Sequence, residues 1–125
     1  MSVDQQRLSD YLAHISEAIE RIDKYTAGMS EAAFLTDALV QDAVIRNLEV
    51  IGEASNNIEK RYPAFAAAHP ELPLGLAYQM RNALAHGYFK VDFGIVWRTI
   101  QAELPLMHTH IVAARAALSL GTGQA

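Results

Sequence analysis

The 125-residue sequence contains no cysteine. This excludes disulfide bonds, catalysis by a thiolate and metal sites built from thiolates. No uninterrupted apolar stretch approaches the roughly 18 to 20 residues that a membrane-spanning helix needs. The N-terminal residues Met1 to Gln6 also lack the basic-then-apolar order of an export signal. We therefore expect a soluble, cytoplasmic protein with no membrane partner.

Positive charge is scarce as well, because 10 Lys and Arg residues are outnumbered by 14 Asp and Glu residues, which gives a formal net charge of -4. Binding to nucleic acid without sequence preference depends on Lys and Arg neutralising phosphates. The charge balance therefore argues against a protein that coats nucleic acid. Any nucleic acid must bind at a local basic site.

Apolar residues are abundant, at 51% of the sequence against 19% charged residues. This is more apolar than a typical soluble domain and favours self-association. A chain of this length forms one domain that buries very roughly two-thirds of the surface exposed by the unfolded chain. We expect a single domain over residues 1–120 and a flexible C-terminal tail over residues 121–125.

Helical periodicity dominates the pattern, and alternation typical of strands is absent. Ser2 and Gln5 resemble a capping box, and the apolar residues after them recur at steps of four and three, which predicts a helix from about Val3 to Ala27. Further helices are expected over 30–35, from Thr36 or Asp37 toward Arg61, over 74–85, and after Asp92 with a break at Pro105. The fold class is therefore all-α, an antiparallel bundle of four to five helices, with residues 63–73 as a connection.

The run Met80 to Tyr88 places an arginine, a histidine and a tyrosine close together at the end of a predicted helix. Arg81 offers a planar charged fork suited to phosphate oxygens, and His86 exchanges protons near neutral pH. On an ideal helix these two side chains point roughly 140° apart. If the helix unwinds at Gly87, His86 and Tyr88 can return toward Arg81. The alternative is a solvated arginine and a histidine favoured by the helix dipole.

Two segments, residues 81–92 and residues 44–54, resemble the HEPN superfamily and specifically its HepT family. Their order, spacing and placement on two long helices extend the resemblance over nearly the whole chain. The resemblance implies a ribonuclease toxin of a toxin–antitoxin pair that works without metal or cofactor, as a homodimer with the arginine–histidine pairs lining a shared cleft. Arg81 and His86 would be the catalytic residues, and Asn82 would position the backbone or the RNA substrate.

The resemblance also implies a control point at Tyr88. A cognate nucleotidyltransferase antitoxin would attach AMP to this tyrosine and silence the toxin. Because the added phosphodiester would compete with the substrate for Arg81, modification should block the enzyme.

Weaker candidates lie on the preceding long helix. Glu53 could orient Arg81 or His86, and Gly52 could let another helix approach closely. Arg46 and Asn47 could support the site. By default, however, the stripe of polar residues that contains Arg46 and Glu53 is a solvated helix face. His14 is isolated in the sequence. Two other functions stay open: a non-catalytic helical module that binds a nucleotide or a nucleotidyltransferase partner, and a dimerising bundle that only neutralises a partner.

Overall fold

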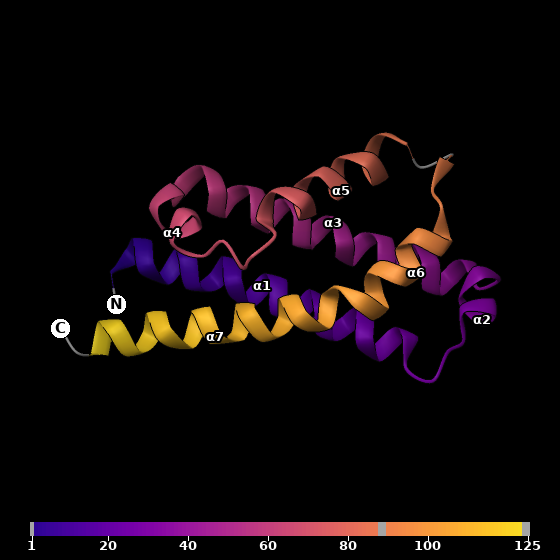
Figure 1. Ribbon diagram of the computed structural model, residues 1–125, viewed down its shortest axis with the longest axis horizontal. Coiled ribbons are helices and arrows are strands. Elements are labelled where there is room, and N and C mark those ends of the chain that lie inside the picture. The colour runs from indigo at the N-terminus through magenta and orange to yellow at the C-terminus, as the bar shows by residue number, and fades with distance from the viewer. Residues whose placement is uncertain (1, 88–89, 124–125) are drawn as a thin grey trace.

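The structure is a computed structural model, and it describes residues 2–87 and 90–123. These residues form seven helices and no β-strand, which confirms the all-α fold (Figure 1). The helices are α1 (Val3–Thr26), α2 (Glu31–Leu35), α3 (Ala38–Arg61), α4 (Pro63–Ala68), α5 (Leu74–His86), α6 (Phe93–Ala102) and α7 (Leu104–Gly123). The count exceeds four to five because the chain also forms the short helix α4 and divides its C-terminal segment into α6 and α7.

The helix starts follow the predicted capping residues. In α1 the Gln5 backbone N–H donates to Ser2 Oγ at 3.1 Å, and the Ser2 N–H donates to Gln5 Oε1 at 3.2 Å, which completes the capping box. Asp37 accepts from the Val40 N–H at 3.0 Å to begin α3, and Asp92 accepts from the Gly94 N–H at 2.9 Å to begin α6. Each cap satisfies donors that the first turn leaves unpaired.

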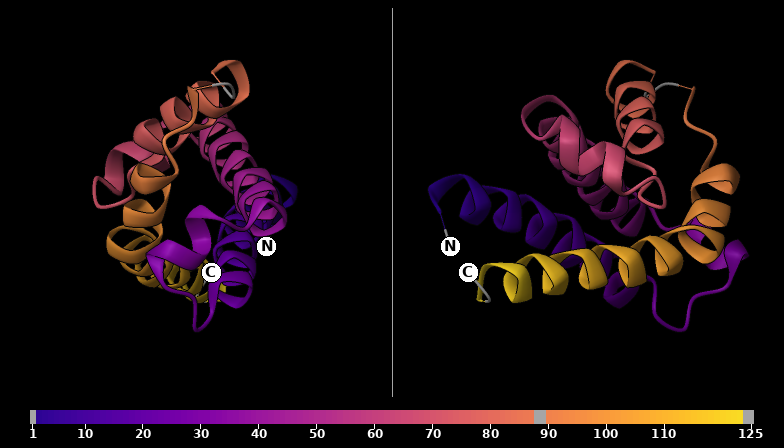
Figure 2. Two further views of the ribbon diagram at one scale, coloured as in Figure 1. Left: turned by 90° about the vertical axis from the view of Figure 1, so that its right-hand side faces the viewer. Right: turned by 60° about the vertical axis from the view of Figure 1, so that its left-hand side comes forward.

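The centre of the molecule is the antiparallel pair α1 and α3. Helix α5 packs along α3, and α7 packs along α1, as Figures 1 and 2 show. The shared core consists of aliphatic side chains at helical spacing, among which the least exposed include Leu12, Ile15, Ile22, Val44, Ile51, Ile58 and Ile111. Burying each such side chain stabilises the fold by about 1.5–3 kcal/mol relative to leaving it exposed.

Pro63 and Pro105 each lie in the first turn of a helix. The expected connection over residues 63–73 contains α4, because Pro63 occupies its first turn, where the missing N–H costs no hydrogen bond. Pro105 lies in the first turn of α7 for the same reason, and the predicted break is confirmed between Ala102 and Leu104. Leu76, expected to face inward on α5, is instead 67% exposed.

Two further segments complete the bundle. Between α4 and α5, His69 Nδ1 lies 2.8 Å from Glu71 Oε1, and this hydrogen bond holds the pKa of the Glu71 carboxyl below its usual value. At the C-terminus, α7 continues to Gly123, which is further than the predicted end of the domain at residue 120. Within the described ranges, no helix combines the length and apolar character needed to cross a membrane.

Candidate functional site

Arg81 is the best-anchored of the predicted site residues. It lies on α5, on the side that faces α3, and its Nη2 is 3.3 Å from Glu53 Oε2 on that helix. Its Nη1 donates to the Oδ1 of its neighbour Asn82 at 3.0 Å. The expected contact between Glu53 and Arg81 is therefore present in the structure, and Asn82 adds a hydrogen bond to the same guanidinium.

The close approach of α5 to α3 depends on Gly52. A Cβ at this position would collide with Arg81 Cβ and would come within 2.7 Å of the Ala77 carbonyl oxygen. Since backbone atoms cannot move aside as a flexible side chain can, any residue with a Cβ would force the two helices apart. Gly52 is therefore part of what places Arg81 next to Glu53, as the sequence predicted for a glycine inside a helix.

Arg81 opens onto a hollow of about 370 Å³ between α1, α3 and α5. We call this the Arg81 hollow. Its other lining residues are Tyr11 and His14 from α1 and, from α3, Arg46, Glu49, Val50, Glu53, Ala54 and Asn57. Two guanidinium groups and an imidazole thus face one solvent-accessible space on a protein that is acidic as a whole.

His86 does not line the Arg81 hollow. It is the last residue of α5 and is exposed, and the next residue, Gly87, still donates its N–H to the Ala83 oxygen at 2.8 Å. The helix is therefore regular through His86 and ends at Gly87, so any return of the chain toward Arg81 would begin after His86. On a regular helix the two side chains leave the axis about 140° apart. The third motif residue, Tyr88, lies outside the described residues.

The remaining candidates from α3 separate into two groups. Arg46 is exposed and lines the Arg81 hollow, so it shares that space with Arg81. Asn47 is 7% exposed, and its side-chain N–H donates to the Ala43 oxygen of its own helix at 2.8 Å. Its amide is thus used within α3 and does not line the hollow.

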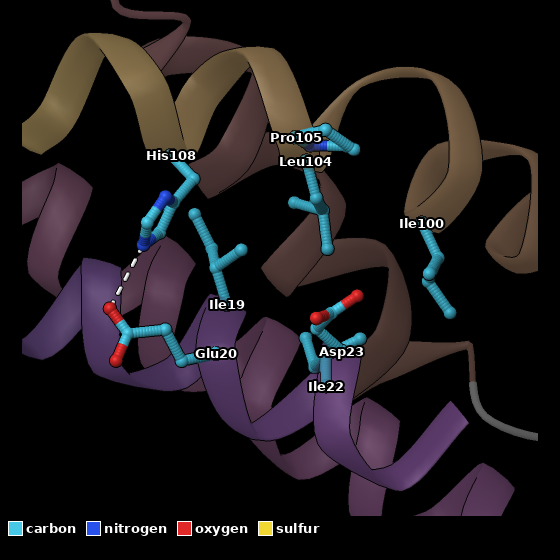
Figure 3. A pocket seen from close by; sticks show the side chains of 8 residues that line it. All are labelled: Ile19, Glu20, Ile22, Asp23, Ile100, Leu104, Pro105 and His108. Atoms are coloured by element: carbon cyan, nitrogen blue, oxygen red, sulfur yellow. Dashed lines mark hydrogen bonds and ion pairs between the residues drawn. The ribbon is translucent and has the colours of Figure 1, made fainter. Parts of the chain in front are cut away.

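A second hollow, of about 230 Å³, lies where α1 faces the junction of α6 and α7 (Figure 3). Its floor is aliphatic, and the Glu20 carboxylate at its edge lies 2.9 Å from His108 Nε2. Asp23 adds another carboxylate, and no arginine or lysine lines the space. This hollow would repel a phosphate group, whereas the Arg81 hollow carries the guanidinium groups that phosphate binding needs.

Two lining residues of the Arg81 hollow escaped prediction. Tyr11 and His14 are three residues apart on α1 and therefore share one helix face, with their ring centroids 6.4 Å apart in an edge arrangement. That spacing is visible in the sequence. The packing of α1 and α5 on α3, which brings this face of α1 to the Arg81 hollow, is not, because it depends on the tertiary arrangement of three helices.

Comparison with known proteins finds one family model, "Ribonuclease HepT-like", that matches residues 15–114. The chain is 45% identical to "Probable ribonuclease HepT" of Thermococcus cleftensis over 96 residues, which cover 77% of this chain and 84% of that protein. It is 35% identical to "Putative RNase TTE0752" of Caldanaerobacter subterraneus subsp. tengcongensis over 101 residues, which cover 81% of this chain and 88% of that protein.

A longer relative is "Gamma-glutamylcyclotransferase and putative RNase MJ0434" of Methanocaldococcus jannaschii. It is 37% identical over 102 residues, which cover 82% of this chain and 45% of that protein. No solved structure matches the chain significantly.

Proposed function

This chain belongs to the HepT-like ribonuclease family, and from that premise we propose that it is an endoribonuclease toxin of a toxin–antitoxin pair that cleaves RNA without a metal ion. The observation that carries the proposal is the anchoring of Arg81, by Glu53 and Asn82, at the edge of a hollow that also holds Arg46. Arg81 and His86 are the proposed catalytic residues.

The chemistry is the attack of the RNA 2′-hydroxyl on its own phosphate. The O2′–P bond forms and the P–O5′ bond breaks, so the products are a 2′,3′-cyclic phosphate and a free 5′-hydroxyl. The His86 imidazole takes the proton of the 2′-hydroxyl, and the departing 5′ oxygen then takes a proton from that imidazolium. Arg81 binds the phosphoryl oxygens and stabilises the negative charge that develops on them.

A second copy of the chain would complete the active site. Within one chain, Arg81 faces the hollow while His86 projects from the end of α5, about 140° away around a regular helix. A two-fold symmetric homodimer can place His86 of one chain beside Arg81 of the other, and symmetry then creates two such sites. Each of the two sites then contains one arginine and one imidazole.

The partner we propose is a nucleotidyltransferase antitoxin that transfers AMP from ATP to the Tyr88 hydroxyl oxygen, with release of pyrophosphate and the hydroxyl proton. Tyr88 follows His86 by two residues in the sequence, so a phosphodiester on it adds a negative charge next to the catalytic pair. Intact-mass measurement after co-expression should show AMP on the wild-type chain and none on Tyr88→Phe. Equal AMP incorporation in both chains would contradict the assignment of Tyr88.

A non-catalytic module that binds a nucleotide or a nucleotidyltransferase partner is the alternative function. The position of His86 outside the Arg81 hollow favours it, because a single chain then binds phosphate without His86 beside it. The third function, a bundle that only neutralises a partner, does not account for a hollow that contains two arginines.

Cleavage of a labelled single-stranded RNA in the presence of a chelator tests the proposal. We expect wild-type cleavage with cyclic-phosphate ends and a loss of at least about 100-fold in His86→Ala, because general acid–base catalysis contributes about 10²–10⁴-fold. His108→Ala is the matched control, since this histidine pairs with Glu20 in the acidic hollow. Parental cleavage by His86→Ala would contradict the catalytic assignment, and loss of cleavage on chelation would contradict a metal-free reaction.

A further inference from the structure

The α1 side of the Arg81 hollow presents two rings whose role the catalytic proposal leaves unexplained. Tyr11 is half-buried and packs against the hydrophobic core, which fixes its ring, whereas His14 is exposed. Their ring centroids are 6.4 Å apart with planes at 80°. A fixed aromatic ring with a second ring at its edge is an arrangement on which a flat ligand can stack.

The dimensions of the hollow suit one nucleotide. Ligand clefts enclose about 300–1,000 Å³, and the Arg81 hollow, at about 370 Å³, lies near the lower limit. Single-stranded RNA is recognised by unstacked bases that lie against aromatic side chains, with the phosphates held by basic groups. Both kinds of group line the hollow, the two rings on α1 and the two arginines on α3 and α5.

The two arginines of the hollow offer donors to a phosphate group from α3 and α5. A guanidinium has five N–H donors, and the contacts of Arg81 to Glu53 and Asn82 occupy one terminal nitrogen each. Donors therefore remain for phosphate oxygens, and Arg46 adds a second guanidinium. Glu49 and Glu53 disfavour a second phosphate in the same space but can accept hydrogen bonds from ribose hydroxyls.

We propose that Tyr11 and His14 form a base-stacking subsite that receives one unpaired nucleotide next to the phosphate bound by Arg81. The subsite rests on the proposed ribonuclease function for the identity of its ligand as RNA. It makes α1 part of the substrate-binding surface, and it makes the enzyme selective for single strands, because a paired base is unavailable for stacking.

Affinity for an RNA that cannot be cut separates this subsite from catalysis. The probe is a fluorescent single-stranded oligonucleotide with 2′-O-methyl groups, which lacks the attacking hydroxyl. Because base stacking on an aromatic side chain contributes about 1–3 kcal/mol, we expect Tyr11→Leu to weaken binding by about 5- to 150-fold. Tyr11→Phe keeps the ring and should bind like the wild type.

Tyr25→Leu is the matched control, because Tyr25 lies on the same helix, is 39% exposed and does not line the hollow. It should leave affinity unchanged. Thermal unfolding of all four proteins confirms that each is folded. A probe whose bases are removed, leaving abasic sugars, should bind the wild type and Tyr11→Leu with equal affinity, because this probe has no base to stack on Tyr11.

The outcomes for the subsite and for the nuclease are distinct. Wild-type RNA cleavage combined with equal affinities for Tyr11→Leu and Tyr25→Leu would overturn the subsite and leave the nuclease intact. The predicted loss of affinity in Tyr11→Leu, without cleavage by the wild type, would overturn the nuclease and support the subsite. A loss in Tyr11→Leu that persists on the abasic probe would also overturn stacking as its cause.

Discussion

At the scale of single residues, the orientation of the Arg81 guanidinium depends on its neighbours and not on its own helix alone. Glu53 and Asn82 each hold one of its terminal nitrogens, and Gly52 admits its Cβ against α3. The Glu53 carboxylate is 56% exposed, and an ion pair of this kind contributes only about 0–1 kcal/mol to stability. The contribution of these contacts is therefore to the orientation of the guanidinium.

Gly52→Ala should reverse the usual effect of replacing a helical glycine. Alanine ordinarily stabilises a helix interior by up to about 1 kcal/mol relative to glycine. Here the new methyl group meets Arg81 Cβ and the Ala77 oxygen, and such overpacking costs about 1–3 kcal/mol. We expect a lower free energy of unfolding in urea and, because Arg81 is displaced, slower RNA cleavage.

Gly75→Ala is the control for this substitution. Gly75 lies in the first turn of α5, and the nearest atoms to an added Cβ are the Glu59 carboxylate oxygens, at 3.7 and 3.8 Å. There is room for the methyl group, so the variant should be as stable as the wild type or up to about 1 kcal/mol more stable. Equal free energies of unfolding for the two variants would show that the α3–α5 contact is not tight at Gly52.

At the scale of helices, the sequence predicted those elements whose signals are local. The capping box at Ser2, the caps at Asp37 and Asp92 and the break at Pro105 are all present, because each depends on residues within one turn of the position concerned. Helix α4 was missed because proline was interpreted as a connection, although the first turn of a helix accepts proline without losing a hydrogen bond.

The candidate site was predicted in part for a related reason. The pairing of Arg81 with Glu53 could be proposed because Gly52, next to Glu53, indicated the close approach of another helix. The position of His86 could not, because Gly87 indicates where a helix ends only to within a residue or two. In the structure α5 includes His86, which does not line the Arg81 hollow.

At the scale of the whole molecule, an acidic chain must bind an anionic substrate. Its net charge is -4, so the charge of the chain as a whole does not attract RNA. Two arginines in the Arg81 hollow supply positive charge beside the carboxylates of Glu49 and Glu53, whereas no arginine or lysine lines the hollow at the α6–α7 junction. In the proposed dimer, a two-fold axis adds the histidine of one copy to the arginine of the other, and α1 supplies the surface on which a base stacks.

Complementation between two inactive variants tests this composite site most directly. Arg81→Ala chains and His86→Ala chains are purified separately, mixed under conditions that exchange subunits, and assayed for RNA cleavage. If each site takes its arginine and its histidine from different copies, the mixture should regain about one quarter of the wild-type rate, because half of the dimers are mixed and one of their two sites is intact. A mixture that stays as inactive as its separate components, with exchange confirmed by native mass spectrometry, would contradict the account.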